Sequence, residues 1–153
     1  VIKNTKLEEE YKEGKYQPLS VVQAVEICKD IVRIFADKNI DIIRIGLQNT
    51  EEISDPKNEG SEVVAGPYHP AFRQLVESAM WYDAIVGKIK KLNAKVKEVE
   101  VSVNPIDSNN VIGHKKENVI KLKNTYDVDL ILKQDKTIKQ GKSRINITKT
   151  YDN

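Results

Sequence analysis

Residues 111–132 read VIGHKKENVIKLKNTYDVDLIL, and this stretch decides how the C-terminal part of the chain folds. Gly113 permits a sharp turn because glycine carries no side chain. The apolar spacing around it predicts a short helix ending at Ile112, a second helix over 116–125 and a strand over 128–133. We therefore expect two helices joined by a tight turn and followed by a strand.

Two further strands are predicted around this stretch. Residues 96–103 read VKEVEVSV, and this alternation is typical of a half-exposed strand. A final strand is expected over 144–149, and Asp107 or Ser108 is expected to cap the first helix. The order of elements over residues 95–153 is therefore β-α-α-β-β.

This order and the Ile-Gly turn resemble a KH module, the RNA-binding domain built around a helix-GxxG-helix turn. Ile112 and Gly113 match the pattern, whereas Lys116 stands where the pattern has its second glycine, so the module is a divergent one. The resemblance implies contact with single-stranded RNA through Gly113, His114, Lys115, Lys116, Asn118 and Lys121. The alternative is a KH-like fold kept for packing, with a solvated lysine cluster at the turn.

The N-terminal part alternates helices with an apolar strand pattern. The expected elements are a short helix over 7–12, a helix over 20–38, a strand over 40–47 and a helix over 71–93. Ser20 and Gln23 form a capping-box pattern that satisfies free N–H groups at a helix start. Residues 40–47 read IDIIRIGL, which is typical of a strand covered on both faces in a parallel sheet. Together these patterns favour an α/β layer.

Three runs in this part resemble the C-terminal region of radical S-adenosylmethionine (SAM) proteins. They are IKNTKLEEEYKEGKYQPLS from residue 2, IIRIGLQNTEEI from residue 42 and VVAGPYHPAFRQLVES from residue 63. The similarity covers about residues 1–82 and extends to the Elongator catalytic subunit and the oxygen-independent coproporphyrinogen oxidase group. It implies the last βα elements of a partial TIM-type barrel, followed by the KH-like module. We thus expect an α/β (α+β) chain with domains over 1–94 and 95–153.

The resemblance also implies positions near substrate or SAM. Ligand-facing groups of such barrels lie at the C-terminal ends of the strands, where Arg44 and Gln48 fall. His69 and Arg73 flank a helix N-terminus, which favours anions. The alternative for Arg44 is an ion pair with a helix acid, and Tyr68, His69 and Pro70 equally fit a structural corner.

Cysteine usage excludes an iron–sulfur cluster held by this chain alone. Cys28 is the single cysteine and falls on an apolar helix stripe, as a small core residue would. A metal site is not expected, and the chain by itself is not expected to be catalytic. The resemblance places SAM and a [4Fe–4S] cluster in the parent enzyme, whose remaining chain would be a partner. Without an apolar span or a signal peptide, we expect no membrane association and a cytoplasmic location.

The two parts of the chain differ in net charge. Residues 86–153 hold 15 Lys and Arg against 8 Asp and Glu, whereas residues 1–85 hold 10 against 15. A basic C-terminal part favours an anionic partner such as tRNA or another RNA, although solvated lysines explain the balance equally well. Three hypotheses follow: a barrel-closing, substrate-recognising region of a radical SAM enzyme, a stand-alone RNA-binding module, or a purely structural closing domain.

Overall fold

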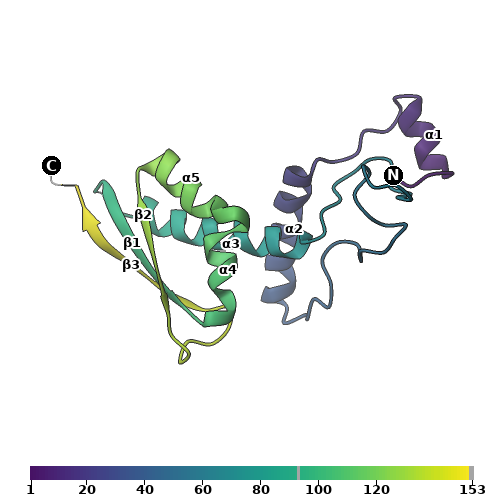
Figure 1. The fold of residues 1–153 in the computed structure, drawn as a ribbon. Coiled ribbons are helices and arrows are strands. Elements are labelled where there is room, and N and C mark those ends of the chain that lie inside the picture. Colours follow the sequence, from purple (N-terminus) through teal and green to yellow (C-terminus); the bar gives the residue numbers. More distant parts are fainter. Residues whose placement is uncertain (93, 152–153) are drawn as a thin grey trace. The chain divides into compact units, whose positions relative to one another are not determined.

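The computed structural model describes residues 1–92 and 94–151, which form two compact units, Val1–Val76 and Glu77–Asn153 (Figure 1). The division falls inside helix α3 (Phe72–Lys90), whose predicted end at residue 93 lies outside the described residues. Mixed helices and strands confirm the α/β class. Domain limits at residues 94 and 95 stay a prediction.

The second unit is built on a three-stranded mixed sheet. Strands β1 (Val96–Val103), β2 (Asp129–Gln134) and β3 (Ser143–Thr150) confirm the three predicted strands of this part. The strand order is β2-β1-β3, with β1 parallel to β2 and antiparallel to β3. Figure 1 shows α4 (Ser108–Ile112) and α5 (Glu117–Tyr126) on one side of this sheet. The central strand β1 therefore provides the hydrogen-bonding partner of both edge strands.

The core of the second unit lies between the sheet and its helices. Val99, Val101 and Val103 alternate along β1 and are fully buried, because every second side chain of a strand points to the same face. Leu122 of α5 is equally buried. The residues of α3 that join this core are Ile85, Val86 and Ile89. The C-terminal part of α3 thus belongs to this unit by packing.

Two short 3-10 turns and two helices connect β1 to β2. They are η1 (Pro105–Asp107), α4 (Ser108–Ile112), η2 (His114–Lys116) and α5 (Glu117–Tyr126). This confirms the predicted β-α-α-β-β order. The predicted cap of the first helix is wrong for Asp107, which stands at the N-cap of α4 without a side-chain capping bond. Its carboxylate instead accepts a hydrogen bond from the Gly141 backbone N–H at 2.8 Å, because α4 follows directly on η1.

The first unit contains α1 (Lys6–Lys12), α2 (Val21–Asp37) and the start of α3. The predicted capping box is confirmed: the Ser20 hydroxyl accepts from the Gln23 N–H at 3.2 Å, and the Gln23 side chain accepts from the Ser20 N–H at 2.8 Å. No helix in the described part of the chain combines the length and apolarity that a bilayer crossing needs.

The strand predicted over residues 40–47 is wrong, because this segment is irregular. Ile43 is 94% exposed and Leu47 67% exposed, whereas Ile42 and Ile45 are half-buried, so the apolar run is not covered on both faces. A strand needs a neighbour that takes up its N–H and C=O groups. The described residues of this unit provide only one isolated antiparallel bridge, between Ile2 and Val63. Hydrophobicity alone therefore does not make this segment a strand.

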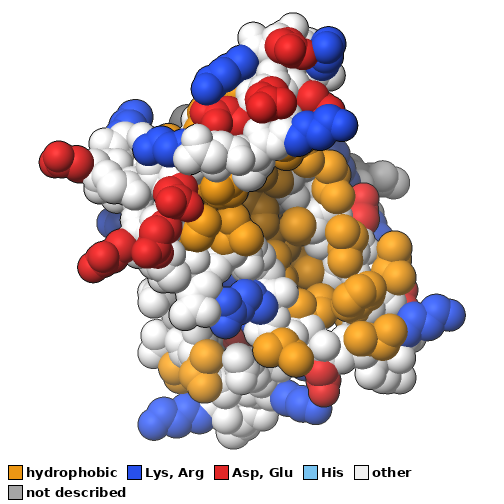
Figure 2. All heavy atoms as spheres, turned by 90° about the vertical axis from the view of Figure 1, so that its right-hand side faces the viewer, with side chains coloured by type: hydrophobic (Ala, Val, Ile, Leu, Met, Phe, Trp, Pro, Cys, Tyr) orange, Lys and Arg blue, Asp and Glu red, His pale blue; other side chains and the backbone are white. Residues whose placement is uncertain are grey.

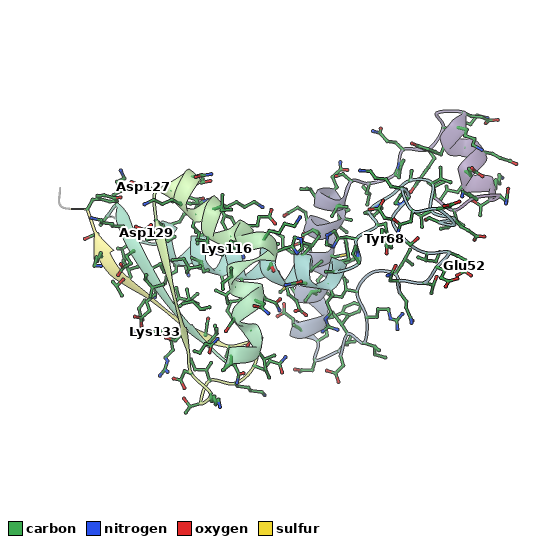
Figure 3. The ribbon with its side chains drawn as sticks, viewed as in Figure 1. Glu52, Tyr68, Lys116, Asp127, Asp129 and Lys133 are labelled. Atoms are coloured by element: carbon green, nitrogen blue, oxygen red, sulfur yellow. The ribbon has the colours of Figure 1, made fainter. Side chains whose placement is uncertain are left out.

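A polar cluster joins the ends of α5 and of β3 (Figure 3). The Tyr151 hydroxyl donates to Asp127 Oδ2 at 2.6 Å, and Lys123 Nζ lies 2.9 Å from Asp127 Oδ1 and 3.1 Å from Asp129 Oδ1. Lys95 Nζ lies 4.6 Å from the centre of the Tyr151 ring. The bond from Tyr151, followed by the one from Lys123, lowers the pKa of Asp127 below its ordinary value.

This cluster makes stability depend on acid pH. Because the folded pKa of Asp127 is lowered, its carboxylate stabilises the fold above the unfolded value of about 3.9, and this contribution is lost as the pH falls through the folded pKa. We expect the free energy of unfolding to fall more steeply below about pH 4 in the native chain than in Asp127→Asn. Denaturant melts at neutral and acid pH measure this difference. Asp129→Asn is the control, since it leaves the tyrosine bond intact, and equal pH dependence in all three proteins would contradict the assignment.

Candidate functional site

The first unit holds a cavity of about 330 Å³. Its walls come from α2, from segments 46–47 and 63–69, and from Phe72 at the start of α3, with Val1 and Ile2 completing them. Cys28 of α2 is half-buried and lies in this wall, as a small packing residue would. The volume falls at the lower end of the range of about 300–1,000 Å³ that small-molecule sites occupy.

Gly46 allows the segment after α2 to pass Phe72 closely. Its φ is +87°, and a Cβ there would lie 3.0 Å from Phe72 Cβ. A side chain at this position would thus meet both backbone strain and a clash. The wall of the cavity therefore depends on glycine at residue 46.

The corner before α3 forms another part of the wall. His69 Nδ1 accepts from the Ala71 N–H at 3.1 Å, and its carbonyl accepts from the Phe72 N–H at 3.1 Å. The Tyr68 hydroxyl donates to Asn49 Oδ1 (Figure 3). These bonds match the structural-corner interpretation, while His69 also lines the cavity, as a substrate-proximal residue would.

The predicted polar residues on segment 40–48 form local pairs. Arg44 Nη1 donates to Gln48 Oε1 at 2.8 Å, so the structure brings these two together. Arg73 Nη1 reaches the carbonyls of Ile42 and Ile43, at 3.4 Å each. The described contacts of Arg44 include Gln48 and no helix acid. None of these three polar side chains is part of the cavity wall.

A second apolar stripe on α2 was missed by the sequence prediction. Ile27, Ile31 and Ile34 follow helical spacing and are 48%, 43% and 58% exposed, whereas Ala24 and Val25 are buried. Figure 2 shows hydrophobic side chains gathered around a hollow on the face that it presents. The signal was present in the sequence, because a helix with apolar residues on two faces is usually covered on both.

In the second unit, the turn between α4 and α5 has an unusual backbone. Gly113 has a φ of +83°, and Lys115 and Lys116 have φ values of +50° and +64°. The Lys116 N–H donates to the Gly113 carbonyl at 3.0 Å and closes the turn. Two consecutive lysines in the left-handed region are costly, so the surrounding contacts must hold them there.

Asn118 provides that support from inside the unit. It is 3% exposed, and its Nδ2 donates to the Ser78 carbonyl at 2.9 Å and the Val111 carbonyl at 3.1 Å. A Cβ on Gly113 would lie 2.9 Å from the Asn118 backbone nitrogen. Asn118 therefore shapes the turn from within, and its buried amide is not part of the surface that RNA was expected to contact.

The remaining residues that were predicted to contact RNA differ in their exposure and in their ion pairs. Lys115 and Lys116 are exposed, and neither forms an ion pair with a residue that the structure describes. Lys121 Nζ lies 2.6 Å from Glu117 Oε1 and 5.9 Å from the centre of the Tyr82 ring. His114 is half-buried and has a partner. The turn thus presents two unneutralised positive charges.

The residues present do not fit an iron–sulfur cluster. Such clusters need several cysteine thiolates, and Cys28 is the only cysteine. Within residues 1–92 and 94–151, His, Cys, Asp and Glu side chains nowhere gather in a group of three that could hold a metal ion. No chemical step is therefore assigned to a cluster on this chain.

Comparison with known proteins gives one match. The family model described as the Radical_SAM C-terminal domain matches residues 1–82, which include α1, α2, the cavity and the start of α3. No curated protein and no solved structure matches the chain.

The contact between Gly113 and Asn118 yields a stability prediction. Gly113→Ala and Gly141→Ala both place a side chain at positive φ, which costs about 1–2 kcal/mol. Only Gly113→Ala also drives a Cβ into Asn118, since nothing lies within 4 Å at Gly141. We expect Gly113→Ala to lower the free energy of unfolding by at least about 1 kcal/mol more than Gly141→Ala, as measured by denaturant melts. Equal losses would show that the turn relaxes without cost.

Proposed function

The chain belongs to the family of radical SAM C-terminal domains, and from this premise we propose that its first unit packs on the cluster-bearing core of a radical SAM enzyme and that its second unit recognises an RNA substrate such as tRNA. The family match places residues 1–82 in a non-cluster region of a radical SAM protein. Family context implies SAM and a [4Fe–4S] cluster in the parent enzyme. Kinship with the Elongator catalytic subunit and the coproporphyrinogen oxidase group is part of this proposal.

The observation that carries the docking proposal is the exposed apolar surface of the first unit. Ile27, Ile31 and Ile34 of α2 line one stripe, and Ile43 and Leu47 protrude from the irregular segment after it. Burial of each such side chain contributes about 1.5–3 kcal/mol, so together they favour a covering partner. A cluster-bearing core is the partner that family membership supports.

The backbone of the segment after α2 supports the same partner. The carbonyls of Ile42 and Ile43 meet only the long 3.4 Å contacts of Arg73 among the hydrogen bonds described. Backbone carbonyls with such long hydrogen bonds are suited to pair with the edge strand of a sheet on the cluster-bearing core. Docking there would close a barrel of which this unit forms the last part.

Residues near the docking surface are proposed to face substrate or SAM. Arg44 and Gln48 lie on the exposed segment, where a guanidinium suits bidentate contact with a carboxylate such as that of SAM. His69 lies in the cavity wall, and Arg73 lies in the first turn of α3, which favours negative charge. These four side chains would then position ligands, while the electron-transfer chemistry belongs to the cofactors of the core.

The second unit is proposed to bind single-stranded RNA as a divergent KH-like module. The supporting observation is the pair of unneutralised lysines, Lys115 and Lys116, on a turn that precedes α5 without a side-chain cap. Lysines contact phosphates as point charges and need no close approach of the backbone. A stand-alone RNA-binding role and a purely structural closing role are the alternatives, and the experiments below separate them.

Docking predicts that charged side chains on the exposed stripe of α2 lower the thermal stability of the assembled enzyme. Ile27→Asp with Ile31→Asp is expected to lower the melting temperature of the radical SAM protein that carries this chain by more than about 5 °C, because it buries two unpaired carboxylates. The control is Ile120→Asp, since Ile120 is 52% exposed on α5, outside this surface. Melting within about 1 °C of the native protein would show that the stripe faces solvent in the assembled enzyme.

RNA recognition predicts a salt-sensitive complex that depends on the turn. We expect Lys115→Glu with Lys116→Glu to weaken binding of a single-stranded RNA at least about tenfold and to reduce the slope of log K against log salt by about 1–2. Fluorescence anisotropy at several salt concentrations measures both quantities. Lys88→Glu with Lys91→Glu is the matched control, because it makes the same charge change at the end of α3. Equal losses in both variants would reduce the effect to net charge, and an unchanged turn variant would move the binding site elsewhere.

A further inference from the structure

The outer edge of strand β2 has no neighbouring strand in its own unit. The sheet order is β2-β1-β3, and β2 pairs with β1 alone. Alternate residues of a strand direct their N–H and C=O groups to opposite sides, so about half of those groups in β2 point away from β1. Among the residues that the structure describes, no further backbone hydrogen bond reaches this strand. Such an edge is able to accept another strand.

Three consecutive apolar side chains lie along this edge, and none of them is fully buried. Leu130 and Leu132 pack against the core of the unit from the helix side of the sheet and are only half-buried. Ile131 lies on the opposite face, where its neighbour on β1 is Glu100, and it is 39% exposed. Edge strands that stay unpaired usually carry charged side chains or proline. The apolar centre of β2 therefore favours a further strand that covers it.

The charged residues of β2 are placed symmetrically about Ile131. Asp129 lies two residues before it and Lys133 two residues after it, at separate positions along the strand (Figure 3). All three side chains share one face, because side chains two residues apart in a strand point the same way. When two copies of this strand lie antiparallel with Ile131 opposite Ile131, each Asp129 is opposite the Lys133 of the other copy. The same arrangement places Leu130 opposite Leu132 on the helix side.

Both charged side chains have the capacity for such a second partner. Lys133 Nζ lies 2.6 Å from Glu100 Oε2, and its side chain is 60% exposed. Asp129 Oδ1 lies 3.1 Å from Lys123 Nζ, and its side chain is 50% exposed. An ammonium group has three N–H donors and a carboxylate accepts at two oxygens, so one ion pair does not exhaust either group. The ion pairs within the chain therefore leave room for ion pairs between two copies.

The other edge of the sheet does not have this self-complementarity. Strand β3 carries Arg144 and Lys149 and no acidic residue, so pairing of β3 with its own copy would bring positive charges together. A different register of β2, centred on Leu132, would place Ile131 opposite Lys133 and lose the charge pairs. The sequence of β2 thus selects one edge and one register.

We propose that β2 is the interface of a symmetric dimer, in which two copies of this chain pair edge to edge, antiparallel about Ile131, and join their sheets. The contact is isologous, so the pair of Asp129 with Lys133 occurs twice. Six residues make a small interface, and we therefore expect a weak dimer whose population depends on concentration. The inference is independent of the proposed RNA recognition, because Lys115 and Lys116 lie outside β2.

Charge reversal tests this interface by sedimentation equilibrium of the 153-residue chain. Asp129→Lys alone and Lys133→Asp alone each place like charges opposite one another at two positions, and we expect each to weaken dimerisation at least about tenfold. Asp129→Lys combined with Lys133→Asp exchanges the charges and is expected to restore the dissociation constant to within about threefold of the native value. An equimolar mixture of the two single variants is also expected to dimerise, because each supplies the charge that the other lacks.

The matched control is Lys149→Asp. Lys149, like Lys133, has a side chain that is 60% exposed and an ion pair to a glutamate of β1, but it lies on β3. We expect this variant to change the dissociation constant less than about threefold. Thermal melting checks that each variant is folded, and recovery in the mixture excludes misfolding as the cause of the loss, since misfolded chains cannot restore one another.

The remaining outcomes overturn the inference. A native chain that stays monomeric at every concentration has no such interface. Dimerisation that survives both single reversals lies elsewhere, for example at the exposed isoleucines of α2. Loss in the single variants without recovery in the exchanged variant or in the mixture excludes the pairing of Asp129 with Lys133. Lys115→Glu with Lys116→Glu is expected to leave the dimer unchanged, so failure of RNA recognition and failure of this interface are read from different measurements.

Discussion

The buried amide of Asn118 is the group around which the turn of the second unit is organised. A buried side-chain amide must have its N–H groups satisfied, and here they reach the carbonyls of Ser78 in α3 and Val111 in α4. One side chain of α5 therefore ties three helices together. Glycine at residue 113 leaves the space that this requires, and the left-handed lysines are held as a consequence. The shape of the turn and the exposure of its charges follow from an interior contact.

The first unit has a different constraint, because several of its large apolar side chains are not buried by its own residues. Its small core is formed around Ala24, Val25, Val63 and Phe72, while isoleucines on the outer stripe of α2 and on the segment after it stay exposed. Membership of the radical SAM C-terminal domain family makes this understandable, because such a region is one part of a larger protein. The two units thus differ in kind: the second buries one face of its own sheet, and the first leaves several large apolar side chains exposed.

Sequence reasoning succeeded where residues of the same unit satisfy a pattern, and it failed where a predicted strand lacks a partner strand in its own unit. The capping box of Ser20 and Gln23 is closed by residues three apart, so it was predictable. The alternation in β1 was equally reliable, because its own unit supplies strands on both sides. Residues 40–47 have a stronger apolar run than β1, yet they form no strand, since the described residues of that unit offer them no partner strand. The N-cap role of Asp107 failed because the carboxylate found a distant N–H, that of Gly141.

The sequence by itself determined the α/β class, the order β-α-α-β-β, the positions of α2 and of the three strands, and the family of residues 1–82. The reason is that hydrophobic periodicity and helix capping involve residues that are close together in the sequence. Only the tertiary structure decided which polar residues are free. It withdrew Asn118 from the surface, and it left Lys115 and Lys116 without an ion pair to any residue that the structure describes. The burial of Asn118 depends on Ser78, which lies forty residues away in the chain, and the distance between them is set by packing, which no spacing in the sequence records.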